Sequence, residues 1–422
     1  MTDLGPRVTG TGLSELAAPV PAPAAPASAG AWARPLSQDE RVRALRVTNA
    51  ASRTGCYALL GALIVAGAVA FPQFLTVANL DNIVSQATPV ALLALGQTFA
   101  LIAGEIDLSV GSIVSLTSVI LANLMASQNS MILPIVALAV AIGVGVGVVN
   151  AALVVLARIP SFIVTLAMML ILEGANLLWT SGGPASNLAP GFAGFAVRSF
   201  GGIPIGLPVL LVATLGTRLL LRRSASGREL YLVGGNRRAA IAAGVRTGRV
   251  LVWAFALSAL GAVLGGIFET SYEGSGQSFL GSGMELSAIA AAVIGGTSLF
   301  GGRGEASNAL GGALVLGVIF DLLTMSGVPV GYESVATGAI LVLGLMFHAR
   351  LERGSGRVAA RLVVLADRLG GRRPRRKRPE LLGPHTADPA AREVCSEPSR
   401  SGDGGERGVL LGGEEPLNAF GR

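Results

Sequence analysis

Several polar side chains with hydrogen-bonding chemistry stand inside otherwise apolar segments, and most of them carry no charge. They are Gln86, Gln97, Thr98, Asn123, Asn150, Thr165 and Asn176. Amide and hydroxyl groups both donate and accept hydrogen bonds, so a series of them along a path suits a neutral polar solute better than an ion. Each could instead hydrogen-bond a neighbouring helix, which is the commoner role of such a residue in a membrane.

Two carboxylates share this apolar setting. Glu173 and Asp321 both lie within segments of low polarity. A proton- or sodium-coupled carrier needs a carboxylate inside the membrane, so an ion-coupled secondary carrier is one alternative that these residues leave open.

A second pair of carboxylates belongs to the motif Gly104-Glu-Ile-Asp-Leu-Ser109. Asp107 and Ser109 are good caps for a helix that begins there. A broken helix end could instead present Glu105 and Asp107 to a polar cavity and shape a gate. These two carboxylates are too few to support the mechanism of a membrane enzyme.

The sequence contains no motif for a nucleotide or a metal. A P-loop needs Gly-x-x-x-x-Gly-Lys-Ser/Thr, and the only lysine is Lys377. Cys56 and Cys395 lie far apart, and the two histidines form no ligand pair. We therefore expect a chain that is not an enzyme and binds no cofactor or metal of its own.

The elements that position the polar residues are apolar segments. The 422-residue chain is 51% hydrophobic and only 14% charged, which is too apolar for an ordinary soluble protein of this size. We expect an all-α polytopic membrane protein of about ten transmembrane helices, each roughly 20 residues long. The segments are 56–72, 82–103, 107–127, 131–157, 161–181, 204–221, 250–269, 285–300, 307–326 and 332–348.

The arginines predict the orientation of these segments. If the segments alternate from an inside start, the inside loops carry Arg158, the arginines of 222–249, Arg303 and the basic residues from Arg350 onward. The outside connections 72–81, 128–130, 270–284 and 327–331 contain no lysine or arginine, and 182–203 contains only Arg198. Because cytoplasmic loops are enriched in Lys and Arg, both termini are expected in the cytoplasm of a multi-pass inner-membrane protein.

Two regions of this map have a second interpretation. Near Gly104 and Gly301 the gaps between apolar segments are short and rich in glycine. Broken or re-entrant helices that line a cavity would produce the same pattern.

Residues 51–350 are expected to form the transmembrane domain, between two cytoplasmic tails. Residues 1–50 are rich in Ala and Pro, and 351–422 are basic, and both are predicted to be largely disordered. The net charge of +7 suits membrane lipids better than nucleic acid, because the arginines flank the apolar segments and only 5% of residues are aromatic.

The segment 222–249 is a polar island between two apolar runs. It holds seven arginines against one acid, Glu229. Asn236 is a good N-cap, Arg237–Ala243 has high helix propensity, and Gly244 suits the left-handed residue that ends a helix. So short a helix is marginal alone, and we expect it to rest against a soluble cytoplasmic partner, although a solvated connector has the same composition.

Five motifs make the chain similar, over about residues 75–350, to the membrane-spanning permease subunit of bacterial ABC importers for monosaccharides, the ribose/xylose type. They are Asn79-Leu-Asp-Asn-Ile, Gly104-Glu-Ile-Asp-Leu-Ser-Val-Gly-Ser, Ile159-Pro-Ser-Phe-Ile-Val-Thr-Leu, Gly234-Gly-Asn with Ala239-Ala240 and Gly244-Val, and Ala288-Ile-Ala-Ala-Ala-Val-Ile-Gly-Gly-Thr-Ser-Leu-Phe-Gly-Gly-Arg-Gly. The resemblance implies import of a monosaccharide by alternating access. Branched-chain amino acid permeases of the same broad superfamily are an alternative.

The resemblance also implies partners and roles. It implies a cytoplasmic ABC ATPase that binds ATP and Mg²⁺, an extracytoplasmic sugar-binding protein and a second permease subunit, as a homodimer. The residues expected to couple to the ATPase are Gly235, Asn236, Arg237, Arg238, Ala239, Ala240 and Gly244. The residues expected at the translocation path or gate are Gln86, Gln97, Thr98, Glu105, Asp107, Ser109, Asn123, Thr165, Glu173 and Asn176.

The chain departs from the family pattern at two places. Arg237 and Arg238 stand where family members often have an acidic residue, and positive charge at a helix N-terminus is unfavourable, so we expect the ATPase to supply carboxylates there. Glu105 stands where ribose-type members tend to have glycine and resembles xylose-type members, which favours xylose or a similar sugar.

Overall fold

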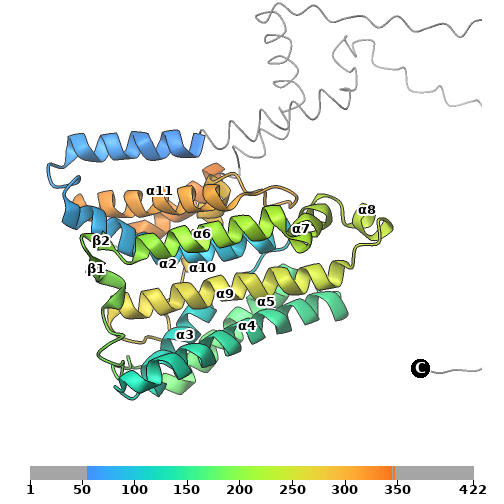
Figure 1. Cartoon of the computed structure of the whole chain (residues 1–422), viewed down its shortest axis with the longest axis horizontal. Helices are drawn as coiled ribbons and strands as arrows, with labels where there is room; N and C mark the ends of the chain where they lie inside the picture. Colours follow the sequence, from blue (N-terminus) through green and yellow to red (C-terminus); the bar gives the residue numbers. More distant parts are fainter. Residues whose placement is uncertain (1–54, 330, 345, 347–422) are drawn as a thin grey trace, which may run out of the picture. The chain divides into compact units, whose positions relative to one another are not determined.

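The computed structural model describes residues 55–329, 331–344 and 346, and all of them lie in the first of two units, Met1–Gly370 and Gly371–Arg422. The predicted tails, 1–50 and 351–422, therefore lie outside the described residues. The described part is almost entirely helical (Figure 1).

Each predicted apolar segment contains a helix. In chain order they are the helix Gly55–Ala70, α2 (Val77–Ile102), α3 (Val110–Leu124), α4 (Ile132–Leu156), α5 (Ser161–Thr180), α6 (Gly206–Arg223), α9 (Thr247–Glu273), α10 (Met284–Ile294), α11 (Ala306–Met325) and the helical residues 331–344. Among the described residues, five helical segments are long and apolar enough to cross a membrane: Val77–Ile102, Asn129–Leu156, Ser161–Thr180, Thr247–Glu273 and Ala306–Met325. The described chain is thus a mostly helical polytopic membrane protein.

The helices α2 and α9 form the centre of the bundle. In the most apolar stretch of each helix, 83% of the α2 residues and 67% of the α9 residues are buried, against 22% for α4 and its preceding turn. Glycine allows the two to pack closely, because a Cβ on Gly261 would lie 2.7 Å from the carbonyl oxygen of Leu92 and 2.8 Å from the Cα of Gly96. Gly265, one turn further along α9, also faces α2, where a Cβ would lie 3.0 Å from the carbonyl oxygen of Pro89.

One connection differs from its prediction. Residues 270–284 were expected to be an outside loop, but the segment between α9 and α10 returns along α3. A Cβ on Gly276 would collide with Ala122, near the end of α3, and one on Gly281 would collide with the carbonyl of Gly111, near its start. The segment thus meets the end of α3 first and its start afterwards, so it runs antiparallel to α3.

Serine side chains of α3 satisfy the backbone of this returning segment. Ser115 Oγ accepts a hydrogen bond from Gly281 N at 3.0 Å, and Ser118 Oγ accepts one from Gln277 N at 3.3 Å. Non-helical backbone at membrane depth needs such partners. The helix α10 has only 11 residues and ends at Ile294 rather than at the expected residue 300.

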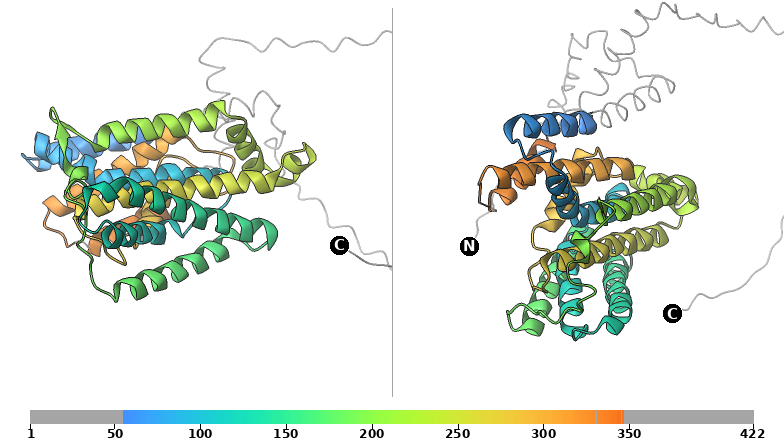
Figure 2. Two further views of the ribbon diagram at one scale, coloured as in Figure 1. Left: turned by 60° about the horizontal axis from the view of Figure 1, so that its bottom comes forward. Right: turned by 60° about the vertical axis from the view of Figure 1, so that its left-hand side comes forward.

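The two ends of the bundle have different chemistry. One end, here called the hairpin end, carries β1 (Ser199–Phe200) and β2 (Ile203–Pro204), the only strands among the described residues, joined by a Gly201–Gly202 turn with φ of +60° and +82°. The other, here called the arginine-rich end, carries α7 (Ala225–Gly235) and α8 (Arg237–Ala242). Figures 1 and 2 place α7 and α8 beyond the ends of α6 and α9 in all three views. The all-α expectation is thus corrected only by a minimal hairpin.

Three helices stop at the arginine-rich end by the same C-terminal motif. After α2, α8 and α10, a glycine adopts the left-handed conformation, at Gly104, Gly244 and Gly296. The residue that follows each glycine bonds back to the last turn, through Glu105 N to Ala100 O, Val245 N to Ala240 O and Thr297 N to Ala292 O. These are Schellman motifs, which satisfy terminal carbonyls and turn the chain sharply.

Candidate functional site

The helix α8 lies where the sequence predicted it. Asn236 Oδ1 accepts a hydrogen bond from Ala239 N at 3.0 Å, and Gly244 has a φ of +81°. Ala240 is buried in a cluster with Val233 and Val250, whereas the opposite face, including Arg238 and Ile241, is exposed. One side of α8 is therefore attached to the bundle and the other is free to meet a partner.

Three of the sequence motifs meet by their backbones just before α8. Gly302 N donates to Ile102 O at 2.8 Å. A Cβ on Gly301 would lie 2.6 Å from the carbonyl oxygen of Gly234 and 2.9 Å from the Cα of Gly104. We call this contact of Ile102, Gly104, Gly234, Gly301 and Gly302 the glycine junction. Glycine is required at these positions because any side chain would push the three backbone segments apart.

Two ion pairs lie beside the glycine junction. Arg237 Nη1 is 3.2 Å from Glu105 Oε1, with the side chains 47% and 12% exposed. Arg222 Nη2 is 2.5 Å from Glu305 Oε1, with 48% and 16% exposed. Each pair joins an arginine of the segment 222–249 to a loop that follows α2 or α10. The carboxylate near Arg237 thus comes from the chain itself.

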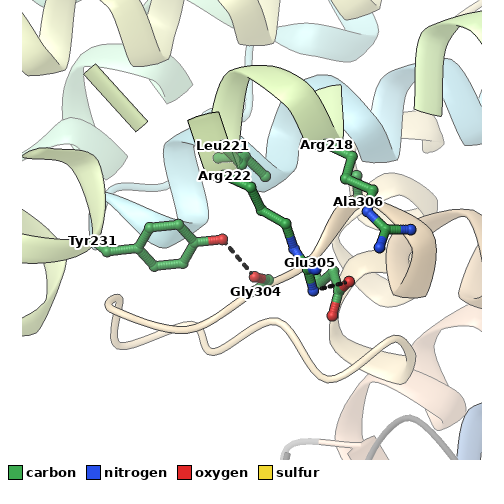
Figure 3. Close-up of a pocket in the computed structure, with 7 residues that line it drawn as sticks. All are labelled: Arg218, Leu221, Arg222, Tyr231, Gly304, Glu305 and Ala306. Atoms are coloured by element: carbon green, nitrogen blue, oxygen red, sulfur yellow. Dashed lines mark hydrogen bonds and ion pairs between the residues drawn. The ribbon is translucent and has the colours of Figure 1, made fainter. Parts of the chain in front are cut away.

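A small cavity of about 190 Å³ opens beside the second ion pair, lined by Arg218, Leu221, Arg222, Tyr231, Gly304, Glu305 and Ala306. Figure 3 shows Arg218 and Arg222 extending from α6 toward the loop while Tyr231 approaches from α7. The Tyr231 hydroxyl donates to Gly304 O at 2.7 Å. Burial and the nearby Glu305 carboxylate raise the pKa of Tyr231 to about 12, against the opposing effect of Arg222, so the phenol stays a donor at neutral pH.

Asp107 and Ser109 lie at the centre of a buried polar network. Asp107 Oδ1 accepts from Ser109 N at 3.1 Å and from Ser109 Oγ at 2.6 Å, and Asn150 Nδ2 of α4 donates to Ser109 Oγ at 2.9 Å. All three residues are fully buried. Asp107 therefore holds Ser109, the residue from which α3 starts, and Ser109 connects that start to α4. The expected side-chain cap is not formed, because neither Asp107 nor Ser109 accepts a hydrogen bond from the first turn of α3.

Gln97 of α2 extends this polar region. Ser258 Oγ of α9 donates to Gln97 Oε1 at 3.2 Å, and Ser258 also faces the Asp107 carboxylate. Within the described residues, several buried polar atoms have no hydrogen-bond partner: Gln97 Nε2, Asp107 Oδ2, Asn150 Oδ1 and Asn176 Oδ1 among them. An unpaired buried group costs about 1–3 kcal/mol, so these atoms are suited to a polar solute or water that passes them.

Thr165 and Asn176 of α5 connect the motif loops to that helix. Thr165 Oγ1 donates to Ile106 O at 3.2 Å, beside Asp107. Asn176 Nδ2 faces Ser112 O at 3.5 Å, and its backbone carbonyl accepts from Ser278 Oγ at 3.4 Å. Glu173, on the same helix, is half-buried and close enough to Glu285 of α10 for the two charges to repel. These residues lie between α3, α5 and the returning segment.

The remaining predicted path residues are not brought into this network. Thr98 Oγ1 donates to Ala94 O, and Asn123 Nδ2 to Val119 O, each within its own helix. Gln86 Nε2 likewise donates to Asn82 Oδ1 one turn away. The side chain of each of these residues therefore forms its hydrogen bond within its own helix and not with a neighbouring helix.

Sequence reasoning missed several residues that the structure brings to the site: Ser115, Ser118, Tyr231, Ser258, Ser278, Glu285 and Glu305. Single serines in apolar helices are too common to stand out. The three-residue spacing of Ser115 and Ser118 on one helix face was an available signal, since both point at the same neighbour.

Comparison with known sequences identifies the family. The family model described as branched-chain amino acid transport system / permease component matches residues 79–345, more than half of the chain. The chain belongs to this permease family. The ribose import permease protein RbsC of Bacillus subtilis (strain 168) is 37% identical over 290 residues, which cover 68% of this chain and 90% of the relative.

Two further relatives of the permease have similar coverage. RbsC of Escherichia coli (strain K12) is 33% identical over 279 residues, 65% of this chain and 87% of the relative. The L-arabinose ABC transporter permease protein AraH of Azospirillum brasilense is 32% identical over 296 residues, 70% and 87% of the two chains. No solved structure matches the permease at a significant level.

These relatives confirm the resemblance read from the five motifs. The chain is a permease subunit of a monosaccharide ABC importer, an integral protein of the bacterial inner membrane, and a separate ATPase hydrolyses the ATP. A permease of this kind works with an ATPase and a substrate-binding protein. None of these three relatives is named for xylose, and Glu105, which had favoured xylose, is engaged by Arg237 instead.

Proposed function

We propose that this permease imports a monosaccharide by alternating access through a homodimer of ten-span subunits with both termini in the cytoplasm. The arginine-rich end then faces the cytoplasm, because Arg158, Arg303 and the seven arginines of 222–249 lie there, against Arg198 alone among the described residues of the hairpin end. The sugar is a pentose or a related monosaccharide, by analogy with the ribose and L-arabinose relatives.

The observation that carries the proposal is the attachment of α8. Its exposed face is free to dock an ATPase that binds ATP and Mg²⁺, while its start is held by backbone contacts to the loops after α2 and α10. A displacement of α8 would therefore reach both loops. Carboxylates of the ATPase are expected near Arg238, which has no ion pair among the described residues.

The buried network supplies the other part of the proposal. We assign the polar path to Gln97, Asp107, Asn150 and Asn176, each of which has a buried polar atom without a hydrogen-bond partner. Three neutral amides and one carboxylate, which already accepts hydrogen bonds from Ser109, suit a sugar, because a sugar offers hydroxyl groups and no charge.

The ion-coupled alternative has little support. The Asp321 carboxylate accepts a hydrogen bond from Asn79 Nδ2 at 2.9 Å, which joins α11 to α2 and suits a structural role. Glu173 remains the carboxylate that such a carrier would need.

Reconstitution tests the proposal directly. Proteoliposomes with the permease, its ATPase and its binding protein should accumulate radiolabelled ribose, arabinose or xylose only when ATP is supplied, and Glu173→Gln should retain this uptake. Accumulation by the permease alone on an ion gradient would overturn it.

A further inference from the structure

We propose that Glu105 is a positioning residue for energy coupling: its ion pair with Arg237 fastens α8 to the loop that leads into α3. The inference rests on the proposed function, because it assumes that α8 receives the movement of the ATPase.

The first support is the position of the two partners. Arg237 is the first residue of α8, and its guanidinium meets a carboxylate that is only 12% exposed. Glu105 in turn directly follows the glycine that ends α2. The pair therefore joins the outermost helix of the arginine-rich end to the boundary between two core helices.

The second support is the shortness of the path beyond Glu105. Asp107 follows two residues later and holds both the backbone N–H and the hydroxyl of Ser109, the residue from which α3 starts. The intervening Ile106 is held as well, since its N–H donates to Ser161 Oγ at 3.3 Å and its carbonyl accepts from Thr165. A displacement of Glu105 is thus passed to α3, α4 and α5 without a flexible linker.

The third support is that the ion pair is not needed for folding. The Arg237 side chain is 47% exposed, so water and salt screen the pair from that side and its contribution to stability is small. The backbone contacts of the glycine junction and the buried Ala240 already place α8. Removing the pair should therefore change how movement is transmitted, while the protein stays folded.

The experiment compares sugar uptake with ATP hydrolysis in proteoliposomes that contain the complete transporter. In Glu105→Gln and Arg237→Gln, the sugar moved per ATP should fall about fivefold or more, the low end of coupling between sites. The charge-swapped double variant E105R/R237E should recover at least half of the wild-type ratio. Arg223→Gln is the matched control, because it removes a neighbouring exposed arginine that forms no ion pair among the described residues.

Each other outcome overturns the inference. Wild-type ratios in both single variants would show that the backbone contacts alone transmit the movement. Losses that the charge swap does not repair would show that the residues act separately. A change in sugar preference in E105Q but not in R237Q would show that Glu105 selects the substrate. If the wild-type transporter itself fails to couple uptake to ATP, the proposed function fails instead.

Discussion

At the scale of single residues, two separate departures from the family pattern prove to be partners. Arg237 looked unfavourable at the N-terminus of its helix, and Glu105 looked like a marker of substrate type. The structure brings them within 3.2 Å although 132 residues separate them in sequence. The carboxylate offsets the misplaced positive charge, so each residue explains the other. No local pattern could have predicted the pair, because the fold alone makes them neighbours.

Asp107 provides a test at the same scale. Asp107→Ala removes the acceptor of two hydrogen bonds from Ser109, and each unpaired buried group costs about 1–3 kcal/mol. Uptake should be lost, while Asp107→Asn, which keeps an acceptor oxygen, should retain part of it. The measurement is sugar uptake normalised to the amount of permease in the membrane. If abundance falls in proportion to uptake, Asp107 acts only in folding, by holding Ser109 at the start of α3.

At the scale of elements, the sequence predicted helices well and broken segments poorly. The apolar segments marked every long helix because lipid leaves a spanning backbone no partner but itself. The returning segment before α10 escaped prediction, since its backbone is satisfied by Ser115 and Ser118 from a distant helix. The glycines near 104 and 301 did signal an irregular region. They could not show that the backbones of both loops contact Gly234.

Adjacent glycines allow a matched test of that closure. A Cβ on Gly234 would collide with the carbonyl of Ile102 and lie 2.7 Å from Gly302 N, whereas one on Gly235 meets nothing within 4 Å. Gly234→Ala should therefore disrupt the glycine junction and lower both thermal stability and uptake. Gly235→Ala should be tolerated, and the better helix propensity of alanine favours it by about 1 kcal/mol. Thermal unfolding of the two purified variants in detergent checks the difference; equal midpoints would contradict the backbone contact.

At the scale of the whole molecule, the arginines determine the orientation in the membrane and the buried polar residues form the proposed sugar path. Arginine in the loops predicts which end faces the cytoplasm, and this could be read from the sequence because it depends on counts and not on geometry. Of the candidate site, Gln97 was found from its polarity in an apolar segment, and Asp107 and Ser109 from the motif that contains them. Ser258 could not be found in this way, because its importance arises only from the packing of α9 against α2.

The proposed function requires that the arginine-rich end faces the cytoplasm and the hairpin end faces outward, and this orientation can be tested. Ile241 on α8 and Phe200 in the β-hairpin are 57% and 69% exposed, so a cysteine at either position is accessible to a thiol reagent. In a background with Cys56→Ser and Cys395→Ser, a membrane-impermeant maleimide should label Phe200→Cys in intact cells and Ile241→Cys only in inside-out vesicles. Adding the purified ATPase should then protect Ile241→Cys, because the exposed face of α8 becomes covered, and should leave the hairpin cysteine unaffected. Labelling of Ile241→Cys from outside the cell would reverse the orientation, and α8 could then no longer receive a cytoplasmic ATPase.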